Sequence, residues 1–144
     1  MRNIFLNFTL ASLLHTPLAA EVFTPAAGSQ LRKEILDALR VPVIADLGAP
    51  IVFHETRLDV DGDVAFVRGV TAMRPGGVPI DLSQTPLFHS GDENIYSTNV
   101  QAFVKRIDGH WEVDVYVVDP TDIWWIGPPY CDDYATLLPT GACE

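Results

Sequence analysis

Two Asp-Gly pairs, each flanked by runs of β-branched residues, constrain the fold of this chain more than any other feature. One pair is Asp61-Gly62, inside the segment 51–73, and the other is Asp108-Gly109, inside 100–118. Asp-Gly favours two-residue turns with positive φ at both central positions, and alternating apolar residues on both sides indicate half-buried strands. The sequence therefore predicts two β-hairpins.

Placing each Asp-Gly pair at the centre of its turn also predicts the register. Leu58 then faces Ala65 in the first hairpin, and Val104 faces Val113 in the second. These apolar pairs should line the core, because a slip of one residue would turn the charged residues of the opposite face inward.

A helix is predicted ahead of the hairpins. Ser29 is suited to cap its first turn, and apolar residues recur at helical spacing from Leu31 to Leu39. Pro42 should end the helix near Leu39 or Arg40, since the residue before a proline avoids the helical region. One helix followed by hairpins favours an α+β roll, in which a curved antiparallel sheet wraps around the N-terminal helix.

Residues 1–20 have the pattern of a signal peptide. Arg2 precedes a mostly apolar run over 4–14, which leads to Ala19-Ala20. This run is too short to span a bilayer, which takes about 20 apolar residues. We therefore expect export to the periplasm or the medium and removal of residues 1–20, which leaves one α+β domain over 21–144.

The charge of residues 21–144 is strongly acidic. They contain eight Lys and Arg against 19 Asp and Glu, a net charge of −11. Such a balance disfavours nucleic acid and anionic lipid as partners. No later apolar run approaches the length of a membrane span, so stable membrane insertion is not expected after the signal is removed.

Both cysteines, Cys131 and Cys143, lie near the C-terminus. Export to an oxidising compartment favours a disulfide between them over free thiols or intermolecular pairing. A disulfide that closes a loop of about 13 residues is worth about 3 kcal/mol in the chain-entropy model. It would pin a C-terminal tail that otherwise frays.

The chain also resembles a known family. The segments that carry the resemblance are 31–40, the hairpin 58–67, 103–106 with 109–111, and Pro120-Thr121-Asp122-Ile123. They are similar to a family of small, exported, uncharacterised proteins of Gram-negative bacteria, over roughly Ser29 to Trp125. The resemblance implies a cystatin-like fold, as in the nuclear transport factor two superfamily, but no catalytic residues. The Cys131–Cys143 tail departs from the family pattern.

Candidate acid-base residues are few. Strand parity places His54 on the face of Leu58, and Asp119 on the face of Val117, so both would line the open end of the roll. A buried histidine beside Asp119, or beside the nearby Asp122, would be a general-base candidate. The competing interpretation is that these groups are exposed or bonded at strand ends.

No metal site or cofactor is predicted. Asp59, Asp61 and Asp63 alternate as at the start of a calcium loop, but Val70 stands where the twelfth-position glutamate belongs, so turn chemistry is favoured. No phosphate-binding glycine loop and no nucleophile motif occurs in the sequence.

Trp124, Trp125 and Tyr130 form an aromatic cluster beside Pro128-Pro129. Such residues anchor interfaces when they are exposed, and the alternative is packing over the mouth of the roll. Our leading hypothesis is an exported, soluble, non-enzymatic module that binds a small ligand or an envelope protein. The alternatives are a small hydrolase or isomerase that uses His54 with Asp119 or Asp122, and an acidic inhibitor of a cationic envelope enzyme.

Overall fold

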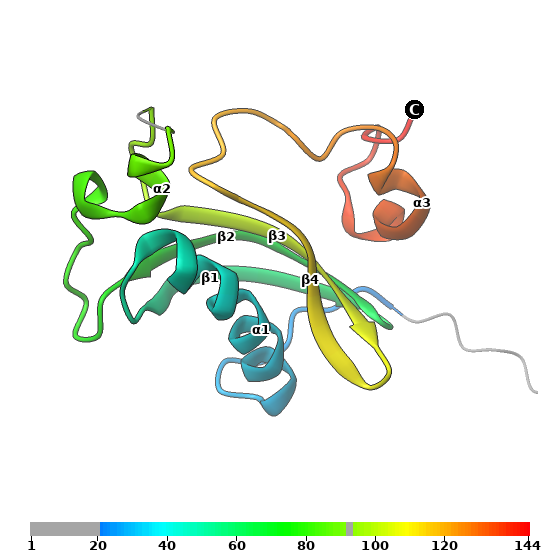
Figure 1. The fold of residues 1–144 in the computed structure, drawn as a ribbon. Coiled ribbons are helices and arrows are strands. Elements are labelled where there is room, and N and C mark those ends of the chain that lie inside the picture. The colour runs from blue at the N-terminus through cyan, green and yellow to red at the C-terminus, as the bar shows by residue number, and fades with distance from the viewer. Residues whose placement is uncertain (1–20, 92–93) are drawn as a thin grey trace, which may run out of the picture.

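The computed structural model describes residues 21–91 and 94–144, apart from the side chains of Glu55 and Thr56. The predicted signal peptide, residues 1–20, lies outside the described residues. Figure 1 shows an α+β fold in which the helix α1 (Gln30–Leu47) packs against one face of a curved antiparallel sheet, as predicted.

The described residues form a four-stranded sheet in the order β1-β2-β3-β4. Its strands are β1 (Val52–Asp61), β2 (Val64–Met73), β3 (Asn99–Ile107) and β4 (His110–Val118). Each strand is antiparallel to its neighbour, so the two predicted hairpins are confirmed. Strands β1 and β4 are the two edges.

The second turn matches its prediction, and the first is displaced by one residue. Asp108 and Gly109 both have positive φ, and Val104 faces Val113. In the first hairpin the turn residues are Gly62 and Asp63, so Leu58 faces Val67 and not Ala65. The displacement shifts the register by two residues, which leaves all three apolar side chains on the same buried face.

Helix α1 begins as predicted, with Ser29 Oγ accepting a hydrogen bond from the Arg32 N–H. The prediction that it ends near Leu39 or Arg40 is wrong, because Pro42 lies inside the helix. Val43 and Leu47 continue the buried stripe of the first half. Burying two such side chains contributes about 3–6 kcal/mol, which offsets the cost of about 3 kcal/mol for an internal proline.

Buried side chains of the described residues form two clusters, one on each face of the sheet. The first lies between α1 and the sheet and includes Ile35, Leu39, Val43, Leu58, Val67, Val100 and Val104. The second lies on the opposite face, where Phe66 and Phe103 pack against the C-terminal residues Tyr134, Leu137, Leu138 and Ala142. Figure 1 shows the chain after β4 crossing above the sheet to reach α3 (Tyr130–Tyr134).

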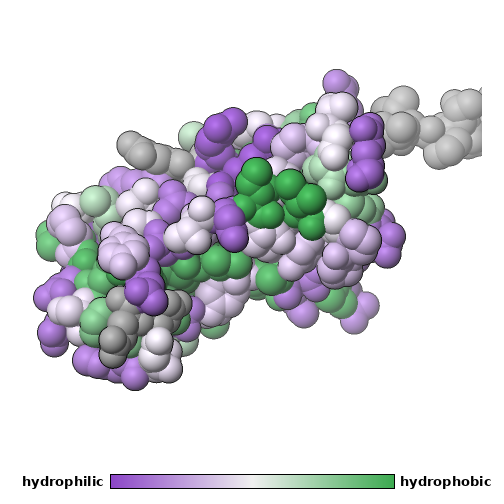
Figure 2. Space-filling model, turned by 90° about the horizontal axis from the view of Figure 1, so that it is seen from above, coloured by the Kyte–Doolittle hydropathy of each residue, from purple (hydrophilic) through white to green (hydrophobic). Residues whose placement is uncertain are grey.

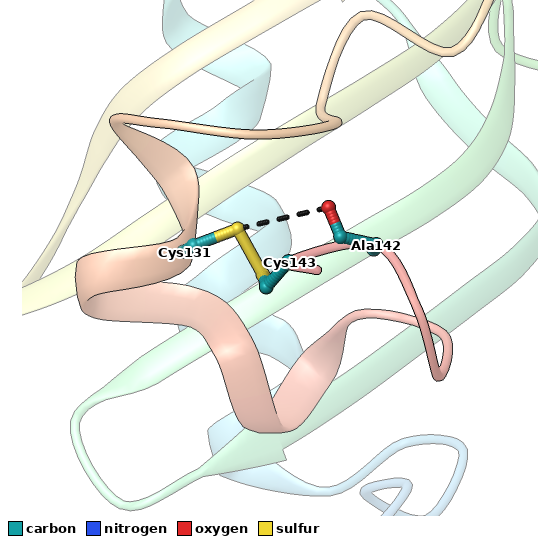
Figure 3. The surroundings of a disulfide bond; sticks show 3 residues. All are labelled: Cys131, Ala142 and Cys143. Atoms are coloured by element: carbon teal, nitrogen blue, oxygen red, sulfur yellow. Dashed lines mark hydrogen bonds between the residues drawn. A yellow bond between two sulfur atoms is a disulfide. The ribbon is translucent and has the colours of Figure 1, made fainter.

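The tail is closed by the predicted disulfide. Cys131 in α3 and Cys143 are bonded, with their Cα atoms 5.6 Å apart. Figure 3 shows the disulfide with Ala142 beside it, whose carbonyl oxygen is 3.8 Å from Cys131 Sγ. The short helix η2 (Ala135–Leu137) lies between the two cysteines. The connection from β2 to β3 carries two further short helices, η1 (Leu82–Gln84) and α2 (Pro86–His89).

Candidate functional site

A groove runs between α1 and the edge strand β4. It consists of two adjoining cavities of about 460 and 450 Å³, which share Ala38 and Trp111. The first is also lined by Glu34, Asp37, Arg106, Gly109 and His110. The second is also lined by Val41, Pro42, Glu112, Val113, Asp114 and Tyr116. We call this feature the α1–β4 groove.

The second cavity is apolar because α1 and β4 both turn apolar side chains toward it. Trp111 and Val113 alternate along β4 and face α1, since both pack against the first buried cluster. Helix α1 adds Pro42 and Val41, whose side chain is 72% exposed. Pro42 has no N–H to donate to the Ala38 carbonyl, so a helical hydrogen bond is missing beside the groove.

Trp111 is the residue on which the groove is centred. Its side chain is only 8% exposed, and among the described residues its indole Nε1–H has no hydrogen-bond acceptor. Unsatisfied buried donors are uncommon and costly in folded proteins. Among the described residues that line the groove, Trp111 is therefore the one with a buried side-chain donor that lacks a hydrogen-bond acceptor.

Tyr116 closes the far end of the groove and ties the two elements together. Its hydroxyl donates a hydrogen bond of 2.7 Å to Asp46 Oδ2 of α1. Burial raises the pKa of Tyr116 to about 12, and the hydrogen bond to Asp46 acts in the same direction, because both favour the protonated phenol.

The raised pKa makes stability depend on alkaline pH. Between about pH 10 and 12 the unfolded chain loses the Tyr116 proton and the folded chain keeps it, so unfolding becomes easier as pH rises. Tyr116→Phe should remove about 1 kcal/mol of this fall in the free energy of unfolding. The expected effect is smaller than the pKa difference alone implies, because the ring is half-buried and solvent screens the hydroxyl. Urea unfolding near pH 9 and pH 11 measures the effect. Tyr96→Phe, at a tyrosine that is 77% exposed, should leave the pH dependence unchanged. If the free energy of unfolding fell equally between pH 9 and pH 11 in Tyr116→Phe and in wild type, the prediction would be contradicted.

The structure separates the predicted pair His54 and Asp119. His54 pairs with Thr71, Thr71 pairs with Asn99, and the Asp119 N–H donates to the Asn99 carbonyl. The residues thus form one row across the sheet, with His54 and Asp119 at opposite edges. Three strand spacings put their backbones about 14 Å apart, so the two side chains do not form a dyad.

The predicted inward placement of His54 is wrong, because its side chain is exposed. Ile51 and Phe53 face α1, and so do Leu58 and Val60. Four residues lie between Phe53 and Leu58, so unbroken alternation would place these two side chains on opposite faces. Because both face α1, the alternation breaks between them. The pairing of β1 with β2 indeed shifts twice between His54 and Leu58, and such a bulge reverses strand parity.

Asp119 holds the end of the sheet to the connection before β3. Its carboxylate accepts hydrogen bonds of 2.6 Å from the Tyr96 N–H and 2.5 Å from the Ser97 hydroxyl. Burial acts to raise the pKa of Asp119, but these hydrogen bonds outweigh it and hold the pKa below its usual value. Asp122 is exposed and lines a small cavity of about 240 Å³ with Asp119.

The aromatic residues of the tail point onto the sheet. Trp124, Trp125 and Tyr130 are half-buried and pack around Phe66 and Phe103 in the second cluster. Figure 2 views the molecule from the side that the tail covers, where the surface is largely hydrophilic around a compact hydrophobic patch. A recognition role for these three aromatic residues stays a prediction.

Sequence reasoning missed the α1–β4 groove. The available signal was weak: Trp111 follows a hairpin turn, and Val41-Pro42 interrupts a polar helix face. With the helix expected to end near Arg40, Val41 and Pro42 had no predicted place beside β4.

Residues 21–91 and 94–144 contain no group of three or more His, Cys, Asp or Glu side chains placed to hold a metal ion. In the same ranges no helix has the length and apolar character needed to cross a membrane. Comparison of this chain with protein-family models, with curated proteins and with solved structures finds no match.

Proposed function

We propose that this chain is an exported, non-enzymatic binding module of the cell envelope and that the α1–β4 groove is its binding site. The observation that carries the proposal is the pair of adjoining cavities, each about 450 Å³, that share Trp111. Ligand sites are mostly apolar concavities of about 300–1,000 Å³ with few polar groups. The second cavity fits that description, and the first adds charged and polar side chains beside it, among them Glu34, Asp37 and Arg106.

Export and a cystatin-like architecture are parts of the same proposal. The Cys131–Cys143 disulfide supports export, because disulfides persist mainly in oxidising compartments. A sheet curved around one N-terminal helix supports a cystatin-like roll. The acidic charge favours solubility and a cationic partner over nucleic acid.

Binding is better supported than catalysis. The histidine and carboxylate on which a hydrolase or isomerase would depend lie at opposite edges of the sheet. The Asp119 carboxylate is also engaged by Ser97 and Tyr96. General-base catalysis needs the base within hydrogen-bond reach of its partner and its substrate.

Native mass spectrometry of the protein purified from its own envelope fraction tests the proposal. We expect the trimmed wild type to carry added mass. Val41→Glu, which puts a carboxylate at the mouth of the apolar cavity, should lose that mass. Val78→Glu should keep it, because Val78 is also exposed but lies outside the groove. A bare wild type, or added mass that survives Val41→Glu, would contradict the proposal.

A further inference from the structure

We infer that the occupant of the α1–β4 groove is an extended segment of a basic partner protein, which adds to the sheet as a new strand beside β4. The inference rests on the proposed function and deepens it, since it names the class of partner. Strand addition to an open edge is a general mode of peptide recognition: backbone hydrogen bonds give affinity and side-chain pockets give specificity.

The outer edge of β4 offers backbone groups for such pairing. In the described part of the chain, β4 pairs with β3 alone. The Arg106 N–H donates to the Asp63 carbonyl on the β2 side, so Arg106 and its partner Trp111 form a non-hydrogen-bonded pair in the β3–β4 ladder. Backbone groups alternate in direction along an antiparallel strand. The N–H and C=O groups of Trp111 and Val113 therefore point outward.

A bulge limits the length of the new pairing. Val113 faces Val104 and Val115 faces Phe103, so Asp114 is an extra residue on β4. Bulges interrupt the regular spacing of the ladder. The regular edge is thus His110–Val113, which can pair with about four residues, a length of about 13 Å.

The groove selects apolar residues at alternate positions of the segment. Side chains of directly opposed residues lie on the same face of a sheet. Residues opposite Trp111 and Val113 therefore face α1 and contact the apolar cavity at Val41 and Pro42. These two positions of the partner should carry apolar side chains.

The intervening position selects a cation. Glu112 borders the groove at the strand edge, but it alternates with Trp111 and Val113, so its side chain lies on the other face of β4. It is exposed and has no ion pair among the described residues. Its cross-strand neighbour Lys105 is bonded to Asp114 and Asp133 instead. A Lys or Arg opposite Glu112 would form a favourable cross-strand pair. The recognised pattern is therefore apolar, basic, apolar.

A second copy of the chain and a small apolar ligand fit these observations less well. Pairing two β4 edges would bring together two chains that each have a net charge of −11 over residues 21–144, and it would place their Glu112 side chains at one seam. A small apolar ligand would leave the outward backbone groups of Trp111 and Val113 without partners. A basic strand avoids the repulsion between like charges and supplies hydrogen-bond partners for these backbone groups.

Amide hydrogen exchange of the whole protein, followed by NMR, tests the inference with the peptide acetyl-Lys-Val-Lys-Val-Lys-amide. At saturating peptide, exchange of the Trp111 and Val113 amide protons should slow at least tenfold. The Glu112 amide should not change, since alternation directs it toward β3. Two matched peptides serve as controls: one has Glu in place of each Lys, and one is methylated on both valine nitrogens, which removes the N–H donors to β4 and puts methyl groups where the two strands would meet. Neither should protect the two amides.

Each outcome decides the question. Shifts at groove residues without protection of Trp111 and Val113, or equal binding of the methylated peptide, would overturn strand addition but leave the proposed binding function standing. Protection of the two amides without peptide, increasing with protein concentration, would identify a second copy as the occupant and overturn the basic partner. No response to the lysine peptide overturns the inference, and a bare protein in native mass spectrometry overturns the binding function as well.

Discussion

Phe103→Ala should destabilise the protein by about 3–5 kcal/mol, the usual cost of deleting a large buried aromatic side chain. Phe103 is fully buried at the centre of the second cluster. Its ring centroid lies 4.0 Å from that of Tyr134 and 4.5 Å from that of Phe66. Trp124 and Tyr130 contact the same ring. The substitution removes the aromatic side chain on which Tyr134, Trp124 and Tyr130 of the tail pack.

Urea unfolding at neutral pH, followed by tryptophan fluorescence and by far-ultraviolet circular dichroism, measures the loss. Ile126→Ala is a matched control in the same tail, because Ile126 is 54% exposed and its truncation should change stability by less than about 0.5 kcal/mol. A loss below 1 kcal/mol for Phe103→Ala would mean that the tail is not packed on Phe103.

Local signals predicted several features of this fold correctly. Asp108-Gly109 forms the expected turn because both residues tolerate positive φ. Ser29 caps the helix because a short hydroxyl side chain can reach the first free N–H groups. The disulfide was predicted correctly because the sequence contains only two cysteines, so a single pairing within the chain is possible. In each case the interaction involves residues close in sequence or a unique pair.

The helix end was predicted wrongly because local and tertiary effects compete there. Pro42 opposes a helix locally, whereas burial of Val43 and Leu47 against the sheet favours it. The second effect depends on the position of the sheet, which the sequence pattern did not reveal. Tertiary packing routinely overrides local propensity.

Parity arguments failed at the bulges. The shift between His54 and Leu58 turns His54 outward, and the shift between Phe103 and Val104 moves all later partners on β4 by one residue. A bulge changes which face a residue occupies without leaving a distinct sequence pattern. The acid-base hypothesis for His54 and Asp119 depended on unbroken alternation.

The cover on the second face of the sheet was also hard to predict. The outward face of the first hairpin has charged residues, including Asp59 and Arg68, which form an ion pair in the structure. Phe66 and Phe103 occupy the same face farther along and require a cover. The tail supplies it through contacts more than 20 residues apart in sequence, such as the hydrogen bond of Trp124 Nε1–H to Gln101.

Replacing both cysteines, Cys131→Ala with Cys143→Ala, should destabilise the protein by about 3 kcal/mol, because the unfolded chain gains the freedom that closure of the 12-residue separation had removed. For a domain of this size that loss lowers the midpoint of thermal unfolding by about 10 °C. Reduced wild type should match the double variant, and reduction should not change the variant further. Thr140→Ala, an exposed site inside the same loop, is the control.

The double variant also tests whether the groove on one face of the sheet depends on the tail on the other face. The disulfide holds the tail on the face opposite α1, where Phe66 and Phe103 lie, and the α1–β4 groove is on the α1 side. At temperatures where the variant remains folded, it should therefore bind the lysine peptide as wild type does, although its tail exchanges amide protons faster. Equal thermal midpoints for variant and wild type would show that the aromatic packing alone fixes the tail. Lost peptide binding in the folded variant would instead mean that the groove depends on the tail, which contradicts a site formed only by α1 and β4.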